Sequence, residues 1–154
     1  GTENLPAIIG LTEAMERFVV EPVFNELSLL PLSERILNFL DSSDVATFRG
    51  HRELRLPNTV AFSVPLSDSI TLLSSLDLEG ICASSGSACS SGSVSPSHVL
   101  TAMGVDNIEA NSLVRFSVGP EISPRDIDHL IFSLPHVFDQ ICERTTSQQP
   151  VNEK

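Results

Sequence analysis

The chain has 154 residues, and its 9 basic and 20 acidic side chains give a formal net charge of −11 at pH 7. This charge repels phosphate backbones and anionic lipid, so we expect neither direct nucleic-acid binding nor membrane-surface binding. With 41% hydrophobic and 19% charged residues, the composition favours a folded globular domain over a disordered chain or a disulfide-dense miniprotein. No apolar run approaches the roughly 20 residues that a membrane-spanning helix needs, so no such helix is expected.

Lysine and cysteine usage narrows the chemistry further. The only lysine is Lys154, the last residue, so chemistry that needs a buried lysine amine, such as a Schiff base, cannot be supplied by the interior of this chain. The three cysteines, Cys82, Cys89 and Cys142, cannot all pair with one another, so at least one thiol is free. A reducing compartment follows most simply, and we expect a cytoplasmic protein, or a mitochondrial one in a eukaryote.

The first two predicted elements are helices. Asn4 is a suitable N-cap and Pro6 fits the first turn, and apolar residues then recur at helical spacing at Ile8, Leu11, Met15, Phe18 and Val19. Pro22 ends or bends this helix. A second helix is predicted to begin after Ser33 and to end in the polar turn 41–44; its apolar residues are Leu32, Ile36, Leu37 and Leu40.

Two segments alternate as half-buried strands do. Residues 58–64 place Val60, Phe62 and Val64 on one side, and residues 113–118 do the same with Val114, Phe116 and Val118. Between them, a helix capped by Ser67 or Asp68 and closed by Gly80 leads into 81–83, a short candidate strand.

The remaining elements are helical and complete the expected fold. Ser95–Pro96 opens a short helix that ends at Gly104, with Val99, Leu100 and Met103 expected to point inward. Ser123–Pro124 begins the last helix, which Pro135 should kink or split. We therefore predict an α+β domain, with a small sheet of three to four strands and helices packed on one face, over residues 1–144. A polar tail, 145–154, is expected to be disordered.

The segment 84–93 places Cys89 among serines and glycines, with no bulky side chain nearby. Because Gly86 and Gly92 allow many backbone conformations and the serines favour solvation, we expect an exposed, mobile Cys89 that moves between an internal site and an external acceptor. The competing interpretation is an ordinary flexible loop in which Cys89 has no role. Cys82 and Cys142 follow apolar residues and are predicted to be buried core thiols.

This cysteine loop resembles that of a known enzyme family. The sequence from Gly80 to Ser93, continued from Ser95 to Gly104, resembles the active-site loop of the cysteine desulfurases, in their long-loop group. These are pyridoxal-phosphate enzymes of the class V aminotransferase superfamily. Three further stretches, 1–6, 55–60 and 113–119, fit the same family in the same order.

The resemblance implies a division of labour between two domains. In that family a large domain preceding these motifs holds the cofactor and its Schiff-base lysine, and a smaller C-terminal domain brings the cysteine loop. This chain looks like the smaller domain, so we expect it to be inactive alone. The implied reaction removes sulfur from L-cysteine, giving L-alanine and a persulfide on Cys89. Acceptors would be an iron–sulfur scaffold or a tRNA-thiolation protein, and the full-length protein would be a homodimer.

The resemblance also assigns two further residues. Arg115 would grip the substrate α-carboxylate, because a guanidinium fork suits bidentate recognition; the alternative is a surface salt bridge. Thr2 would donate its hydroxyl to the cofactor phosphate of the partner subunit; the alternative is a residue at the entry of the first helix. His98, nine positions beyond Cys89, is expected to have a structural or polar-face role rather than to form a Cys–His dyad. The histidines show no ligand spacing with the cysteines, so no metal site is expected.

Two other functions stay open on the sequence. The chain could be a stand-alone persulfide carrier or acceptor-binding module that uses Cys89 without a cofactor. It could also belong to a selenocysteine lyase, although the long Ser/Gly loop makes this less consistent. The sequence immediately upstream of Gly1 separates the first two functions, because a lysine-bearing cofactor domain there would establish the desulfurase.

Overall fold

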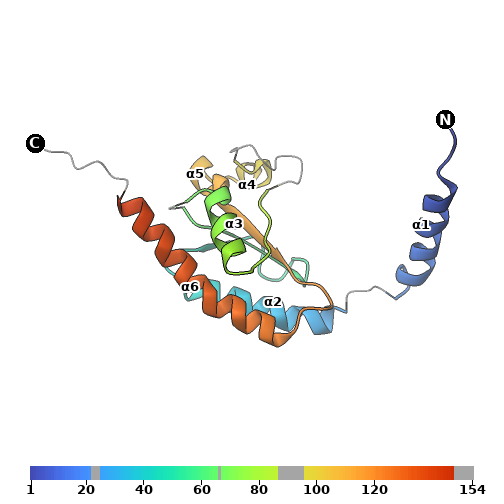
Figure 1. Cartoon of the computed structure of the whole chain (residues 1–154), viewed down its shortest axis with the longest axis horizontal. Coiled ribbons are helices and arrows are strands. Elements are labelled where there is room, and N and C mark those ends of the chain that lie inside the picture. Colours follow the sequence, from blue (N-terminus) through green and yellow to red (C-terminus); the bar gives the residue numbers. More distant parts are fainter. Residues whose placement is uncertain (22–24, 66, 87–95, 148–154) are drawn as a thin grey trace, which may run out of the picture.

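The computed structural model describes residues 1–21, 25–65, 67–86 and 96–147, with only the backbone described for 145–147. Within these ranges the fold is α+β, as predicted, with three strands and six helices (Figure 1). The helices are α1 (Leu5–Phe18), α2 (Glu26–Asp41), α3 (Ser69–Leu78), α4 (His98–Ala102), α5 (Asn107–Asn111) and α6 (Pro124–Ser147). The strands are β1 (Thr47–Arg49), β2 (Thr59–Ser63) and β3 (Leu113–Ser117).

The three strands form one antiparallel sheet in the order β1-β2-β3. The predictions of β2 and β3 are confirmed, because both keep alternate residues buried. β1 was not predicted, since three residues are too few for a period-2 pattern to be recognised. The prediction of a short strand at 81–83 was wrong. These residues form no strand, and the chain that follows them pairs with β3 through an isolated bridge between Ser84 and Arg115.

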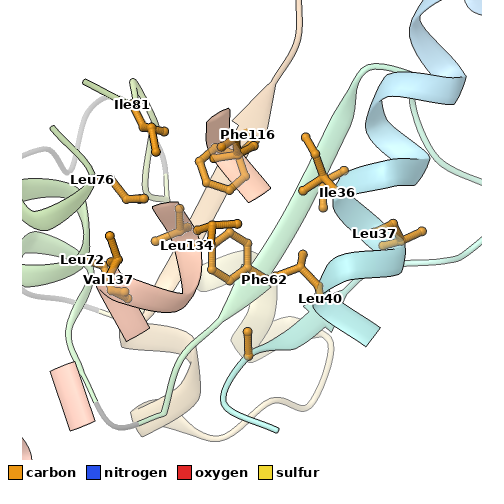
Figure 2. Close-up of a cluster of buried hydrophobic side chains, with 14 of the residues drawn as sticks. Ile36, Leu37, Leu40, Phe62, Leu72, Leu76, Ile81, Phe116, Leu134 and Val137 are labelled. Atoms are coloured by element: carbon orange, nitrogen blue, oxygen red, sulfur yellow. The ribbon is translucent and has the colours of Figure 1, made fainter. Parts of the chain in front are cut away.

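Helices α2, α3 and α6 cover one face of the sheet and enclose the core (Figures 1 and 2). Phe62, fully buried on β2, is central to it. Its ring centroid lies 5.3 Å from that of Phe116 and 6.2 Å from that of Phe138, so β2, β3 and α6 meet in one aromatic cluster. Aliphatic side chains complete the core, including Ile36, Leu40, Leu72, Leu76, Leu134 and Val137.

Helix α2 begins earlier than its sequence predicts. It starts at Glu26, and the side chain of Asn25 caps it by accepting from the backbone N–H of Leu27 at 2.9 Å. Pro31 lies inside the helix. The missing N–H of this proline would have bonded the carbonyl of Leu27, a residue that is 83% exposed, where water can replace it. Ser33, expected at the start, is fully buried and donates to the carbonyl of Pro57 at 2.5 Å.

Helix α6 runs through Pro135 without being split, contrary to one of the two predicted outcomes. Buried apolar side chains on both sides of the proline, Leu134 and Val137 among them, dock the two halves onto the same core. The helix reaches Ser147, beyond residue 144, where the sequence suggested that the domain ends.

Helix α3 has both of its predicted ends. Asp68 caps it by accepting from the backbone N–H groups of Ile70 and Thr71. At the other end Gly80 has φ +73°, and the N–H of Ile81 returns to the carbonyl of Leu76 at 2.9 Å. This Schellman-type ending requires the left-handed conformation that glycine adopts without strain.

The two short helices after the cysteine segment differ from expectation. In α4 only Leu100 is buried, whereas Val99 and Met103, predicted to point inward, are each about half exposed. The five residues of α4 complete little more than one turn, so one side chain is enough to dock it. Helix α5 was not predicted; Asp106 caps it by accepting from the N–H groups of Ile108 and Glu109.

Helix α1 has its predicted cap, since Asn4 accepts from the N–H of Ala7 at 3.2 Å. None of its residues is buried against the rest of the described chain (Figure 1). Four of its apolar side chains, Leu5, Ile9, Leu11 and Met15, are more than half exposed, and Ile8 and Phe18 are about half exposed. No helix in the described ranges is both long enough and apolar enough to cross a membrane.

Candidate functional site

Arg115 lies on the face of the sheet opposite the core. Its neighbours on β3, Val114 and Phe116, are buried, and alternation along a strand turns Arg115 outward, where it is exposed. In register it lies opposite Ala61 of β2, which in turn lies opposite Arg49 of β1. This face, called the open face below, therefore carries two arginines on either side of a small residue.

The two arginines differ in their electrostatic partners. Arg49 forms an ion pair with Glu109. Among the described residues, no carboxylate lies within ion-pair distance of Arg115. The Arg115 guanidinium keeps its fork of donors available, so it can bind a carboxylate from outside the described chain in two parallel hydrogen bonds.

The segment that contains Cys89 begins beside Ser84, whose backbone is hydrogen-bonded to the backbone of Arg115. Ser84 donates its N–H to the carbonyl of Arg115 at 3.1 Å, and the N–H of Arg115 donates to the carbonyl of Ser84 at 2.7 Å. Gly86, two residues later, has φ +44°, a conformation that favours glycine. Cys89 lies outside the described residues, so its exposure stays a prediction.

The chain after Cys89 is anchored at Ser97. This residue is buried and donates its N–H to the carbonyl of Ala110 in α5 at 3.0 Å. Its Oγ accepts from the N–H of Leu100 and so caps α4. The two ends of the cysteine segment are thus attached to the sheet, one through β3 and the other through α5.

The motif 55–60 braces the far end of β3. Asn58 donates from its side-chain amide to the carbonyl of Val118 at 3.3 Å, and its backbone carbonyl accepts from the N–H of Val118 at 2.9 Å. Arg55 donates from Nη1 to the buried hydroxyl of Ser33 at 3.0 Å. The motif therefore ties β3, and with it Arg115, to helix α2.

Other predicted residues lie apart from this arrangement. Thr2 is exposed and precedes α1, so the described residues do not bring it next to Arg115. His98 is the exposed first residue of α4. Within the described ranges, no three His, Cys, Asp or Glu side chains are grouped so that they could hold a metal ion.

The prediction that Cys82 and Cys142 are core thiols was wrong. Cys82 is exposed and lines a hollow of about 340 Å³, together with Leu73 and Asp77. Ile81 occupies the core position, and the side chain of Cys82, the next residue, is exposed. Cys142 is half-buried on α6.

Sequence reasoning missed the ion pair between Arg49 and Glu109. The pair joins residues that are 60 positions apart, so no local spacing signals it. One partial sign exists: Glu109 stands three residues after the helix cap Asp106, which is typical of a first helical turn. That pattern predicts α5 but not the partner of its glutamate.

Comparisons with known proteins agree with this geometry. The model of the Aminotransferase class-V family matches residues 1–130. The chain therefore belongs to the class V aminotransferase family.

Within this family, its relatives are cysteine desulfurases. The chain is 36% identical to the cysteine desulfurase IscS 1 of Archaeoglobus fulgidus over 141 residues, which are 92% of this chain and 37% of that protein. It is also 36% identical to the cysteine desulfurase IscS of Methanosarcina thermophila, covering 92% of this chain and 35% of that protein. The chain thus spans about a third of the length of these relatives, and the predicted resemblance is confirmed.

Solved structures show the same relationship. A NifS-like protein from Rickettsia africae superimposes with a TM-score of 0.75 at 32% identity, over 90% of this chain and 36% of that one. The cysteine desulfurase CsdA of Escherichia coli matches with a TM-score of 0.65 at 17% identity, over 91% of this chain and 32% of that one. At that identity the second match shows the shared fold.

Proposed function

We propose that this chain is the C-terminal part of a cysteine desulfurase that converts L-cysteine to L-alanine and carries the released sulfur as a persulfide on Cys89. One observation carries the proposal. Arg115, which has the chemistry to hold a carboxylate, exchanges backbone hydrogen bonds with Ser84, from which the segment containing Cys89 departs. A substrate held by Arg115 would lie beside the base of that segment.

The chemistry divides between these two residues. Arg115 orients L-cysteine by its carboxylate, and Cys89, as a thiolate, is the nucleophile toward the substrate sulfur. In the net reaction a sulfur–sulfur bond forms on Cys89 and the carbon–sulfur bond of the substrate breaks. The electron pair of that bond and a proton become a C–H bond of alanine, so carbon is reduced and the transferred sulfur is oxidised.

The class V aminotransferase family uses pyridoxal phosphate, which supplies an electron sink for the substrate. The described residues contain no lysine, so they do not by themselves hold this cofactor covalently. We propose that Thr2 donates its hydroxyl to the cofactor phosphate across a homodimer and that the lysine is provided by a cofactor domain. The exposed apolar surface of α1 is consistent with packing against such a domain.

We further propose that the persulfide is delivered to an iron–sulfur scaffold or a tRNA-thiolation protein in the cytoplasm. The exposed thiol of Cys82 supports a reducing environment, in which an unpaired surface cysteine persists.

The test is a sulfur-transfer assay on the full-length protein loaded with pyridoxal phosphate. We expect equal amounts of alanine and protein-bound sulfane sulfur from L-cysteine, with both lost in Cys89→Ser. Cys82→Ser and Cys142→Ser are matched controls and should keep the activity. Alanine formation that persists in Cys89→Ser would contradict the proposal. Persulfide acquired from a donor without cofactor, with no alanine produced, would favour the stand-alone carrier.

A further inference from the structure

An enclosed ion pair connects the open face of the sheet with helix α5. Arg49 Nη2 lies 2.5 Å from Glu109 Oε2, and the two side chains are 15% and 28% exposed. The other ion pairs in the described chain are more open, such as Arg52–Asp41 at 48% and 39%. Because water screens the Arg49–Glu109 pair less, it couples the two elements more strongly than a surface pair would.

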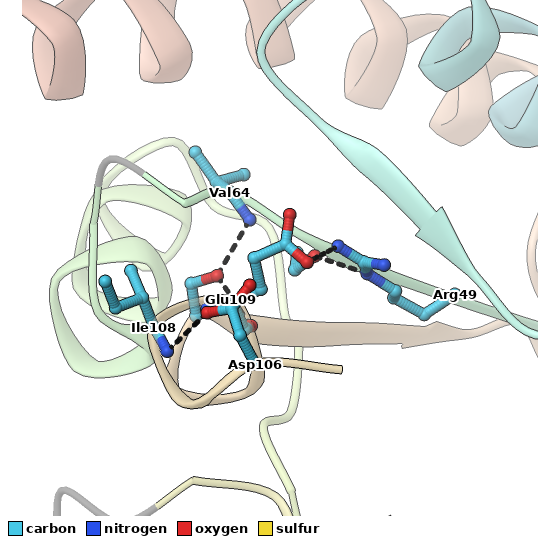
Figure 3. Close-up of polar contacts among 7 residues, drawn as sticks. Arg49, Val64, Asp106, Ile108 and Glu109 are labelled. Atoms are coloured by element: carbon cyan, nitrogen blue, oxygen red, sulfur yellow. Dashed lines mark hydrogen bonds and ion pairs between the residues drawn. The ribbon is translucent and has the colours of Figure 1, made fainter. Parts of the chain in front are cut away.

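Further hydrogen bonds extend this contact into a network between β1, β2 and α5 (Figure 3). The network, formed by Arg49, Ser63, Val64, Glu109 and Ser112, is called the bracket below. Arg49 also donates from Nε to Ser63 Oγ at 2.6 Å. Ser112 donates its hydroxyl to the carbonyl of Glu109 at 2.9 Å and accepts from the N–H of Val64 at 3.0 Å. The ion pair with Arg49 holds the side chain of Glu109. The contacts of Ser112, the C-cap of α5, hold this end of the helix against Val64, the residue after β2.

Helix α5 depends on such contacts because it is short. Five residues cannot hold a helix by themselves, and Ala110 is its only buried residue. The carbonyl of Ala110 is the acceptor that fixes Ser97, eight residues beyond Cys89. The position of Ser97 therefore depends on what keeps α5 in place.

We propose that Arg49 and Glu109 are positioning residues that set the distance between Arg115 and the anchor at Ser97. Arg49 is in register with Arg115 through Ala61, and Glu109 precedes the residue that holds Ser97. The ion pair thus links β1, which is joined to the strand of Arg115 through β2, to the helix that anchors the chain returning from Cys89. This role rests on the proposed desulfurase function. The ion pair governs how often the Cys89 thiolate meets the substrate sulfur, whereas the contact between Arg115 and the substrate carboxylate does not depend on the ion pair.

The experiment compares four variants of the full-length protein: Arg49→Gln, Glu109→Gln, the exchange Arg49→Glu with Glu109→Arg, and Arg52→Gln. The last is the matched control, because it removes an ion pair close in sequence that does not reach α5. Two readouts are taken on each: amide hydrogen exchange over residues 96–112, and the rate of persulfide formation on Cys89 at saturating L-cysteine together with KM.

In Arg49→Gln and Glu109→Gln we expect faster exchange at the Ser97 amide and persulfide formation slowed about three- to tenfold, with KM changed less than about twofold. The charge exchange should restore part of both losses, and Arg52→Gln should change neither. The proposal is overturned if exchange at Ser97 stays as in the unsubstituted protein, or if KM rises as much as the rate falls. If the unsubstituted protein makes no persulfide, the proposed function fails, while the exchange data still show whether the bracket holds Ser97.

Discussion

Replacing Arg115 with glutamine tests the substrate-binding residue with little effect on the fold. The side chain is exposed, and no ion pair in the described chain includes it, so the free energy of unfolding should change by less than about 0.5 kcal/mol. A charge-assisted hydrogen bond to a carboxylate contributes about 1.5–3 kcal/mol. Its loss should raise the KM for L-cysteine about 10- to 150-fold, with a smaller change in kcat, since the contact exists before and during the reaction.

The assay is steady-state alanine production by the full-length enzyme. Arg125→Gln is the matched control, because Arg125 is an exposed arginine on α6, which packs on the other face of the sheet. The KM of Arg115→Lys should lie between those of Arg115→Gln and Arg125→Gln, since lysine keeps the charge and loses the planar fork. An Arg115→Gln enzyme whose KM stays within twofold of the unsubstituted value would refute the assignment of Arg115 to the carboxylate.

Three further outcomes follow from the described geometry. Phe62→Ala, which empties the centre of the aromatic cluster, should lower the free energy of unfolding by about 3–5 kcal/mol in urea titrations; a loss under 1 kcal/mol would contradict the packing. The pKa of Asp68 lies below its usual value: burial acts to raise it, but hydrogen bonds from Thr71 and Ile70 outweigh burial. The stabilisation from the Asp68 charge should therefore be full above about pH 4 and decline as the pH falls through the lowered pKa. The free energy of unfolding of the unsubstituted protein should then exceed that of Asp68→Asn by less in acid than at neutral pH. A difference between the two that stays constant from pH 7 to pH 2 would contradict this prediction. In a Cys89→Ser background, iodoacetamide should modify exposed Cys82 faster than half-buried Cys142, with equal rates expected only after unfolding.

Predictions from the sequence succeeded where the signal is local. The alternation around Phe62 and Phe116 identified two strands and their buried faces, and Asn4 and Asp68 marked helix starts, because a cap bonds to backbone groups only two or three residues away. They failed where distant contacts decide. The second helix was predicted to begin after Ser33, whereas α2 begins at Glu26 and continues through Pro31, because the residues on both sides of the proline pack on the core.

The candidate site divides in the same way. The resemblance of the loop around Cys89 and of the strand with Arg115 to the cysteine desulfurases suggested sulfur chemistry and carboxylate binding, and a thiol and a guanidinium have the chemistry for those roles. Only the folded chain decided that Ser84 is paired with Arg115 and that Glu109 forms an ion pair with Arg49, since the bridge joins residues 31 positions apart and the ion pair joins residues 60 positions apart. Such contacts depend on the register of three strands and on the placement of α5, which the free energy of the whole core sets and no short segment encodes.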